Sequence, residues 1–230
     1  MSAIADIITK YSSMFGVAAV TTLLLSVFTV LFSFIIGSLL AVMKISSIKP
    51  LRWLANIYVE FIRGTPLLVQ VYVVFYGLPL LGVSVPSFDL LGNDFSRLFA
   101  GIIALVVNSS AYVCEIVRGG ILSIDSGQME AARSIGFSKT QSMLLIIFPQ
   151  TIKNILPSLG NEFVSVIKNS SQVSVIGVAE LMYTTNTIRS ISFRSFEPLI
   201  IVSVIYFIMT FIISSVIKRF EMRLAVSDRK

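Results

Sequence analysis

The chain has 230 residues, 55% hydrophobic and only 13% charged, with a net charge of +6 and a mean hydropathy of +0.89. Soluble domains carry about 25% charged residues, so this composition excludes an ordinary soluble protein and indicates that the lipid bilayer surrounds most of the chain. The absence of histidine excludes histidine-based catalysis, and the single cysteine, Cys114, excludes an internal disulfide. In a membrane protein a positive charge reflects basic residues held on the cytoplasmic side, so we expect no nucleic-acid partner.

Five apolar runs are long enough, or nearly so, for a helix of about 20 residues that crosses the hydrocarbon core. They predict an all-α integral membrane protein with five transmembrane helices. The predicted spans are about 15–43, 57–80, 98–115, 154–180 and 198–217. No internal repeat or low-complexity tract is visible, so we expect a single transmembrane permease domain over 1–230.

Basic residues are unevenly distributed between the two sets of loops. Most of them follow spans one, three and five: Lys44, Lys49, Arg52, Arg118, Arg133, Lys139, Lys153, Lys218, Arg219, Arg223, Arg229 and Lys230. The positive-inside rule therefore places the N-terminus outside and the C-terminus in the cytoplasm. The polar loop at about 119–150 is then cytoplasmic.

The second run carries Gly-Thr-Pro at 64–66, which predicts a break or kink because proline cannot donate a backbone hydrogen bond. A broken helix at membrane depth exposes backbone groups that can hold a ligand. We therefore assign Glu60, Thr65 and Gln70 to the solute pathway. The alternative is a bend needed only for packing, with Glu60 paired to Arg63.

The third run contributes Asn108 as a further pathway candidate. Glu115 and Arg118 are three residues apart and predict an ion pair within one helix near its cytoplasmic end. Cys114 fits a small buried residue rather than a reactive one.

The cytoplasmic loop predicts a short helix at 128–134, a bend at Gly136 and a second short helix at 139–147, with Ser138 as its N-cap and Pro149 at its end. Such a helix–glycine–helix element suits docking into a groove of another protein. The alternative is an amphipathic segment lying on the membrane surface.

The fourth run places four polar residues at spacings of four, three and four, so they share one helical face: Asn161, Ser165, Lys168 and Gln172. A lysine facing lipid costs a few kcal/mol, so Lys168 is expected to face protein, water or an anion. This face either meets a small polar solute or holds helices together, with Lys168 paired to a helix carbonyl or to Glu162.

Glu130-Ala131-Ala132, followed by three residues, Gly136, nine residues and Ile-Ile-Phe-Pro, resembles the EAA loop of ABC-importer permeases. The usual ending is Ile-x-Leu-Pro, so Phe148 departs from it by an apolar exchange. Three longer stretches, "FIRGTPLLVQ", "YVCEIVRGGILSIDSGQMEAA" and "FPQTIKNILPSLGNEFVSVIKNSS", resemble the polar amino-acid uptake branch of that family, in the family's order.

This resemblance implies the non-catalytic permease subunit of an ATP-driven importer in a bacterial inner membrane. Its partners would be two copies of an ATP-binding-cassette ATPase, an extracytoplasmic amino-acid-binding protein, membrane lipid and a second permease, identical or different. ATP and Mg would bind the ATPase, because this chain has no phosphate-binding loop, cofactor or metal site. Coupling to the ATPase is carried over to Gln128, Glu130, Ala131, Ala132, Arg133 and Gly136.

One other class remains as an alternative, and a further one is excluded. An ion-coupled secondary transporter or a channel would use Glu162 and Lys168 to bind an ion, but would not need the cytoplasmic docking element. An intramembrane enzyme lacks a nucleophile-and-base set. The transported amino acid stays open between cystine, glutamine, glutamate, arginine, histidine and lysine.

Overall fold

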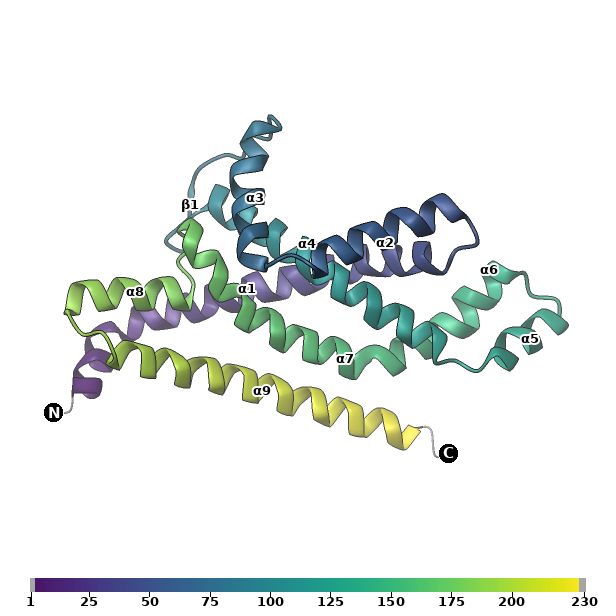
Figure 1. Ribbon diagram of the computed structural model, residues 1–230. Helices are drawn as coiled ribbons and strands as arrows, with labels where there is room; N and C mark the ends of the chain where they lie inside the picture. Colours follow the sequence, from purple (N-terminus) through teal and green to yellow (C-terminus); the bar gives the residue numbers. More distant parts are fainter. Residues whose placement is uncertain (1–2, 228–230) are drawn as a thin grey trace.

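A computed structural model describes residues 3–227 and shows an elongated, almost entirely helical molecule (Figure 1). Within the described residues, four helices pass the length and hydropathy requirements for a membrane span, and one bent helix pair meets them together. The prediction of an all-helical chain is confirmed. The N-terminus lies at one end of the molecule, and the α5–α6 region lies at the other (Figure 1).

Helix α1, Ala3–Ile45, contains the predicted first span but is much longer. Its 43 residues extend about 65 Å at 1.5 Å per residue, which is more than twice the thickness of the hydrocarbon core. Helix α1 must therefore tilt in the membrane or extend beyond its surface. Its buried face consists largely of small and hydroxyl residues, which let α1 approach α4 closely. A Cβ at Gly37 would lie 2.8 Å from the Val113 side chain, so this crossing admits only glycine.

The predicted second span is two helices, α2 (Lys49–Arg63) and α3 (Leu67–Leu80), bent by 110° (Figure 1). The prediction of one helix over 57–80 was therefore wrong, and the predicted break at 64–66 is confirmed. Pro66 is the extended residue before α3, where its missing N–H does not interrupt a helix. Helix α3 stands away from the long helices and packs mainly on α4 (Figure 1).

A small antiparallel hairpin, β1 (Asp89–Leu90) and β2 (Asn93–Asp94), precedes α4, Phe95–Leu122. The Asp94 carboxylate caps α4 by accepting from the Ser96 backbone N–H at 2.9 Å. The backbone and side-chain hydrogen bonds of Ser96 lower the pKa of Asp94.

The cytoplasmic-loop prediction was correct for the first helix and wrong for the second. Helix α5 spans Ser126–Ser134, but α6 (Lys139–Ser142) continues without a break through a π-helical segment, η1 (Met143–Ile147), into α7 (Phe148–Asn169). Pro149 does not end this run, because it lies in the first turn of α7, where the π-helical hydrogen-bonding pattern changes to the α-helical one. The bend at Gly136 is therefore joined directly to a membrane helix.

The predicted fourth span ends too late. Helix α7 ends at Asn169 and tightens into a 3-10 helix, η2 (Ser170–Ile176), which stops at Gly177 with φ +81°. A short helix that the sequence did not predict, α8 (Leu181–Ser192), then leads to α9 (Glu197–Ser227), which contains the predicted fifth span. Three apolar clusters form the core, and the central ones join α1, α3, α4 and α7.

Candidate functional site

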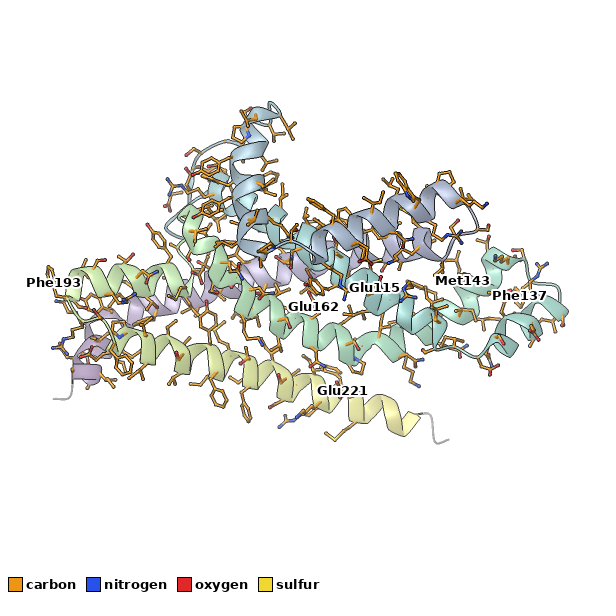
Figure 2. All side chains as sticks on the ribbon, in the orientation of Figure 1. Glu115, Phe137, Met143, Glu162, Phe193 and Glu221 are labelled. Carbon is orange, nitrogen blue, oxygen red and sulfur yellow. The ribbon has the colours of Figure 1, made fainter. Side chains whose placement is uncertain are left out.

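Two groups of predicted site residues lie in different parts of the molecule. The coupling candidates lie on or beside α5 at one end, and the pathway candidates lie on α2, α3, α4, α7 and η2 between the ends. Figure 2 shows this separation: Phe137 marks the α5–α6 bend, Glu162 lies between the ends, and Phe193 marks the opposite end.

The bend between α5 and α6 is fixed by backbone geometry. Gly136 has φ +95°, a left-handed conformation that side chains rarely adopt. The N–H of Phe137 donates to the Ala132 carbonyl, and the N–H of Gly136 donates to the Arg133 carbonyl, so the last carbonyls of α5 are satisfied. Ser138 then begins α6 with a reciprocal capping box to Gln141. The bend is thus a defined turn rather than a loose linker.

The exposed surface of α5 carries most of the coupling candidates. Gln128, Glu130, Ala131 and Arg133 are exposed, and Arg133 also donates to the Phe137 carbonyl at 3.0 Å. Ala132 is only 2% exposed, so it packs inside the chain and is not available to a partner.

Sequence reasoning missed one exposed apolar residue beside this surface. Ile135 is 76% exposed and lies four residues after Ala131, so the two side chains share a helical face. An apolar residue in the middle of a polar loop was the signal that could have found it.

Three pathway candidates bond one another at the break between α2 and α3. Gln70 is buried, and its Nε2 donates to the Ile62 carbonyl and to Thr65 Oγ1, both at 2.8 Å. Asn108 Nδ2 on α4 donates to Gln70 Oε1 at 2.9 Å. These bonds satisfy carbonyls released by the bend and attach it to α4, so the three residues form a buried polar clamp.

The candidates on α7 and η2 are arranged differently. Asn161 and Lys168 are exposed, Ser165 is half-buried, and Ser165 donates only to the Asn161 carbonyl of its own helix, at 3.1 Å. Within residues 3–227, the Lys168 side chain has no ion pair and no hydrogen bond, and the half-buried Gln172 side chain has none either. The pairing of Lys168 with Glu162 is not found, because Glu162 instead accepts from Ser109 Oγ on α4 at 2.7 Å.

Helix α2 carries two charged candidates that the sequence could have paired with each other. Glu60 is exposed, and the alternative in which Glu60 pairs with Arg63 is not found among the described residues. The Arg63 guanidinium instead lies over the Tyr112 ring of α4, 5.5 Å from its centroid.

The predicted Glu115–Arg118 ion pair is confirmed, with Arg118 Nη2 2.8 Å from Glu115 Oε2. The sequence did not reveal its third member, Lys44 Nζ, at 2.5 Å from Glu115 Oε1. This contact joins the C-terminal end of α1 to α4, near the end of the molecule where α5 and α6 lie.

Glu180 was also missed, because it lies at the edge of an apolar run with no basic residue close to it in the sequence. Its side chain is fully buried, accepts from the Tyr183 N–H at the start of α8, and accepts from the Tyr206 hydroxyl of α9, both at 2.8 Å. It therefore fixes α8 to α9.

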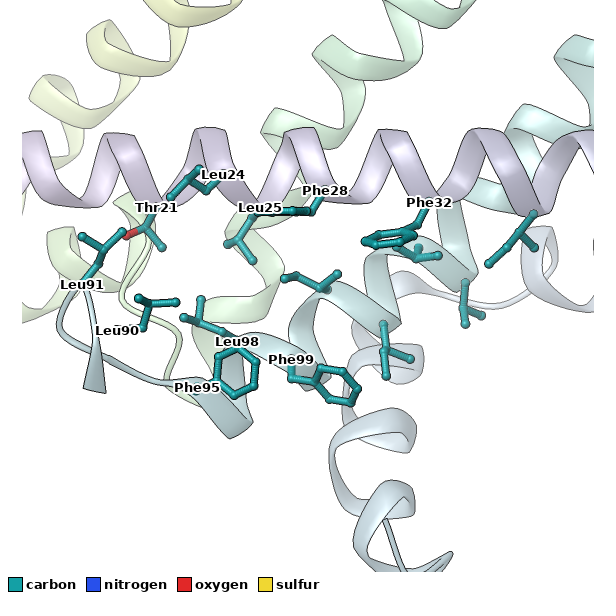
Figure 3. A pocket seen from close by; sticks show the side chains of 15 residues that line it. Thr21, Leu24, Leu25, Phe28, Phe32, Leu90, Leu91, Phe95, Leu98 and Phe99 are labelled. Atoms are coloured by element: carbon teal, nitrogen blue, oxygen red, sulfur yellow. The ribbon is translucent and has the colours of Figure 1, made fainter. Parts of the chain in front are cut away.

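A groove of about 540 Å³ between α1, α4 and the hairpin has no suitable chemistry for a polar solute (Figure 3). Its lining is apolar except for Thr21, whose hydroxyl bonds to the Val17 carbonyl of its own helix. No group of three or more potential metal ligands lies together in the part of the chain that the structure describes.

Long apolar helices with a rigid polar bend at one end define the class, a multi-pass helical membrane protein. The chain belongs to the family described as binding-protein-dependent transport system inner membrane component, whose model matches residues 33–226. It is an ABC-transporter permease for polar amino acids and an inner-membrane protein.

Individual relatives agree with this assignment. The chain is 42% identical over 206 residues to the probable glutamine ABC transporter permease protein GlnM of Bacillus subtilis, covering 90% of this chain and 91% of the relative. It is 36% identical to the arginine transport system permease protein ArtQ of the same organism, with 90% of each chain covered. A crystal structure of an amino acid ABC transporter with histidines superposes with a TM-score of 0.83 at 45% identity, over 94% of this chain and 96% of that one.

Proposed function

We propose that this chain is the transmembrane subunit of an ATP-driven importer that receives a polar amino acid from an extracytoplasmic binding protein. Two copies of an ATPase subunit would bind ATP and Mg, and a second permease, identical or different, would complete the pathway. The chain itself would perform no covalent chemistry. The relatives named for glutamine and arginine transport support an amino-acid substrate without fixing which one.

The single observation that carries this proposal is the rigid bend from α5 to α6. Its two caps and the left-handed Gly136 hold α5 in one orientation, while Glu130, Ala131 and Ile135 remain exposed. Because α6 continues through η1 into α7, a displacement of α5 reaches a membrane helix without a flexible linker. A surface that docks a moving ATPase needs this combination of exposure and stiffness.

The basic residues at the α5–α6 end of the molecule support an orientation of the chain in the membrane. The start of α2 lies at the end of the molecule where α5 and α6 lie (Figure 1), and this end carries many of the basic residues outside the spans. The positive-inside rule supports a cytosolic position for it, so the N-terminus would lie outside.

In the membrane, the face formed by Asn161, Ser165 and Lys168 is our proposed solute surface. These polar groups have no partner on another helix, and lipid contact would cost a few kcal/mol for the lysine alone. A water-filled pathway shared with a second permease would remove that cost. We assign Gln172, one turn beyond Lys168 on η2, and the exposed Glu60 of α2 to the same pathway.

The test is amino-acid uptake into proteoliposomes that contain the permease, its ATPase and the binding protein. We expect uptake to stop with a hydrolysis-defective ATPase and to continue when ionophores dissipate all ion gradients. Uptake that continues with the inactive ATPase and stops with ionophores would establish the alternative, an ion-coupled transporter. Running the assay with a panel of amino acids identifies the substrate.

A charge reversal at the coupling surface tests the same proposal from this chain. We expect Glu130→Lys to insert and fold normally, to lose the ATPase during purification and to abolish uptake. The matched control is Glu221→Lys, the same reversal on α9. Normal ATPase binding and uptake in Glu130→Lys would remove α5 from the mechanism.

A further inference from the structure

The first six residues of α2, at 49–54, are all exposed. The helix is held by the rest of the chain only from Ala55 onward, where Ala55, Val59 and Ile62 are buried. A three-residue turn after α1 precedes this end, so it lies where two membrane segments meet at a bilayer surface.

This end of α2 combines basic and aromatic side chains. Lys49 and Arg52 lie three residues apart and are both exposed. Trp53 is 67% exposed, and Ile57 and Phe61 follow at intervals of four residues on the same face, 46% and 65% exposed. The apolar stripe thus runs about 12 Å along α2 from a basic, tryptophan-bearing end.

The chain itself provides no partner for this surface. Neither Lys49 nor Arg52 makes an ion pair or side-chain hydrogen bond between residues 3 and 227, whereas nearby Lys44 pairs with Glu115. Tryptophan prefers the membrane–water interface, where its ring lies at headgroup level, and basic side chains beside it attract anionic lipids.

We propose that this basic–aromatic end of α2 binds an anionic phospholipid of the cytoplasmic leaflet. Lys49 and Arg52 contact the phosphate, Trp53 lies at the level of the headgroup, and Ile57 and Phe61 contact the acyl chains. Each basic residue near an anionic membrane surface is worth about a factor of five in binding. The inference rests on the proposed function only for the orientation that places this end in the cytosol.

The test uses the fluorescence of Trp53, because the chain contains one tryptophan. The full chain is reconstituted into vesicles that contain either brominated phosphatidylglycerol or brominated phosphatidylcholine at the same mole fraction. We expect the brominated anionic lipid to quench Trp53 several-fold more efficiently at low salt, and the preference to shrink as salt screens the charges. This measurement needs no variant, no ATPase and no transport.

Two paired variants locate the effect. Lys49→Gln with Arg52→Gln should abolish the preference for the anionic lipid, whereas Lys218→Gln with Arg219→Gln should retain it, although it removes the same charge from the end of α9. Equal quenching by both lipids in the unmodified chain, or equal loss in both double variants, overturns the proposal. Absence of quenching by either lipid also overturns it, since Trp53 is then covered by protein. If the unmodified chain prefers the anionic lipid but shows no ATP-dependent uptake with its partners, the proposed function fails and the lipid inference stands.

Discussion

The polar residues of the α2–α3 break and those of α7 look equivalent in sequence, but their surroundings are opposite. Thr65, Gln70 and Asn108 bond to one another and to a released backbone carbonyl. Asn161 and Lys168 have no side-chain partner in the described chain. Polar side chains at membrane depth therefore fall into two kinds, those that stabilise an irregular backbone and those that need an outside partner.

The largest expected effect that separates the two kinds is on transport. We predict that Lys168→Met lowers amino-acid uptake at least tenfold and leaves the melting temperature of the purified complex unchanged, because the Lys168 side chain has no hydrogen bond or ion pair within residues 3–227. Tenfold corresponds to about 1.4 kcal/mol, the worth of one charge-assisted contact. Lys218→Met on α9 is the control. A lower melting temperature with normal uptake would place Lys168 among the structural residues.

The next effect is on stability. We predict that Gln70→Leu lowers the free energy of unfolding by about 2–4 kcal/mol, because it leaves the buried Asn108 amide without a partner and the Ile62 carbonyl with only a long bond of 3.4 Å from Thr65 Oγ1. Thermal melts should show it, and Gln172→Leu, which removes an amide without hydrogen bonds, should change the melting temperature little. Equal melting temperatures for the two variants would contradict the buried clamp.

Thr65→Val tests one bond of the clamp. The variant keeps the side-chain shape and loses the Oγ1 contacts with the Phe61 carbonyl and Gln70 Nε2. We predict a loss of about 1 kcal/mol in the free energy of unfolding. In the background of Gln70→Leu the loss should be smaller, because one of its bonds is already absent. Full additivity of the two losses would indicate that the residues act independently.

The smallest effect concerns Asp94, which belongs to neither group. Its folded-state pKa is below its unfolded value, so its stabilising contribution is present above the unfolded pKa and is lost as the pH falls through the folded pKa. We predict that unmodified protein and Asp94→Ala differ in melting temperature at pH 6 and converge below about pH 4. A difference that stays constant down to pH 3 would show that the carboxylate charge does not contribute.

The sequence predicted what depends on local composition. Apolar runs located the long helices because burial in lipid requires them, and the Gly-Thr-Pro sequence located the break. Gly136 and Ser138 identified the bend between α5 and α6 because left-handed backbone and N-capping have strong local preferences.

The features that could not be predicted from the sequence depend on contacts between residues far apart in the chain. The 110° angle of the break is set by the packing of α3 on α4, so the bond between Gln70 and Asn108 could not be foreseen. Helix α8 was missed because its fixation comes from Glu180 and Tyr206, which are 26 residues apart. The continuity of α6 into α7 cannot be read from the sequence, because Pro149 predicts the end of a helix as readily as its first turn. In the structure Pro149 lies in the first turn of α7, where proline is tolerated.

The most direct test of the central claim is the accessibility of α5 in the assembled transporter. In a Cys114→Ser background, Ala131→Cys should react rapidly with a water-soluble maleimide in the isolated permease and at least tenfold more slowly once the ATPase is bound. Ala132→Cys, at a position that the chain itself buries, should react slowly in both states. If Ala131→Cys reacts at the same rate with and without the ATPase, α5 does not carry the coupling and the account is wrong.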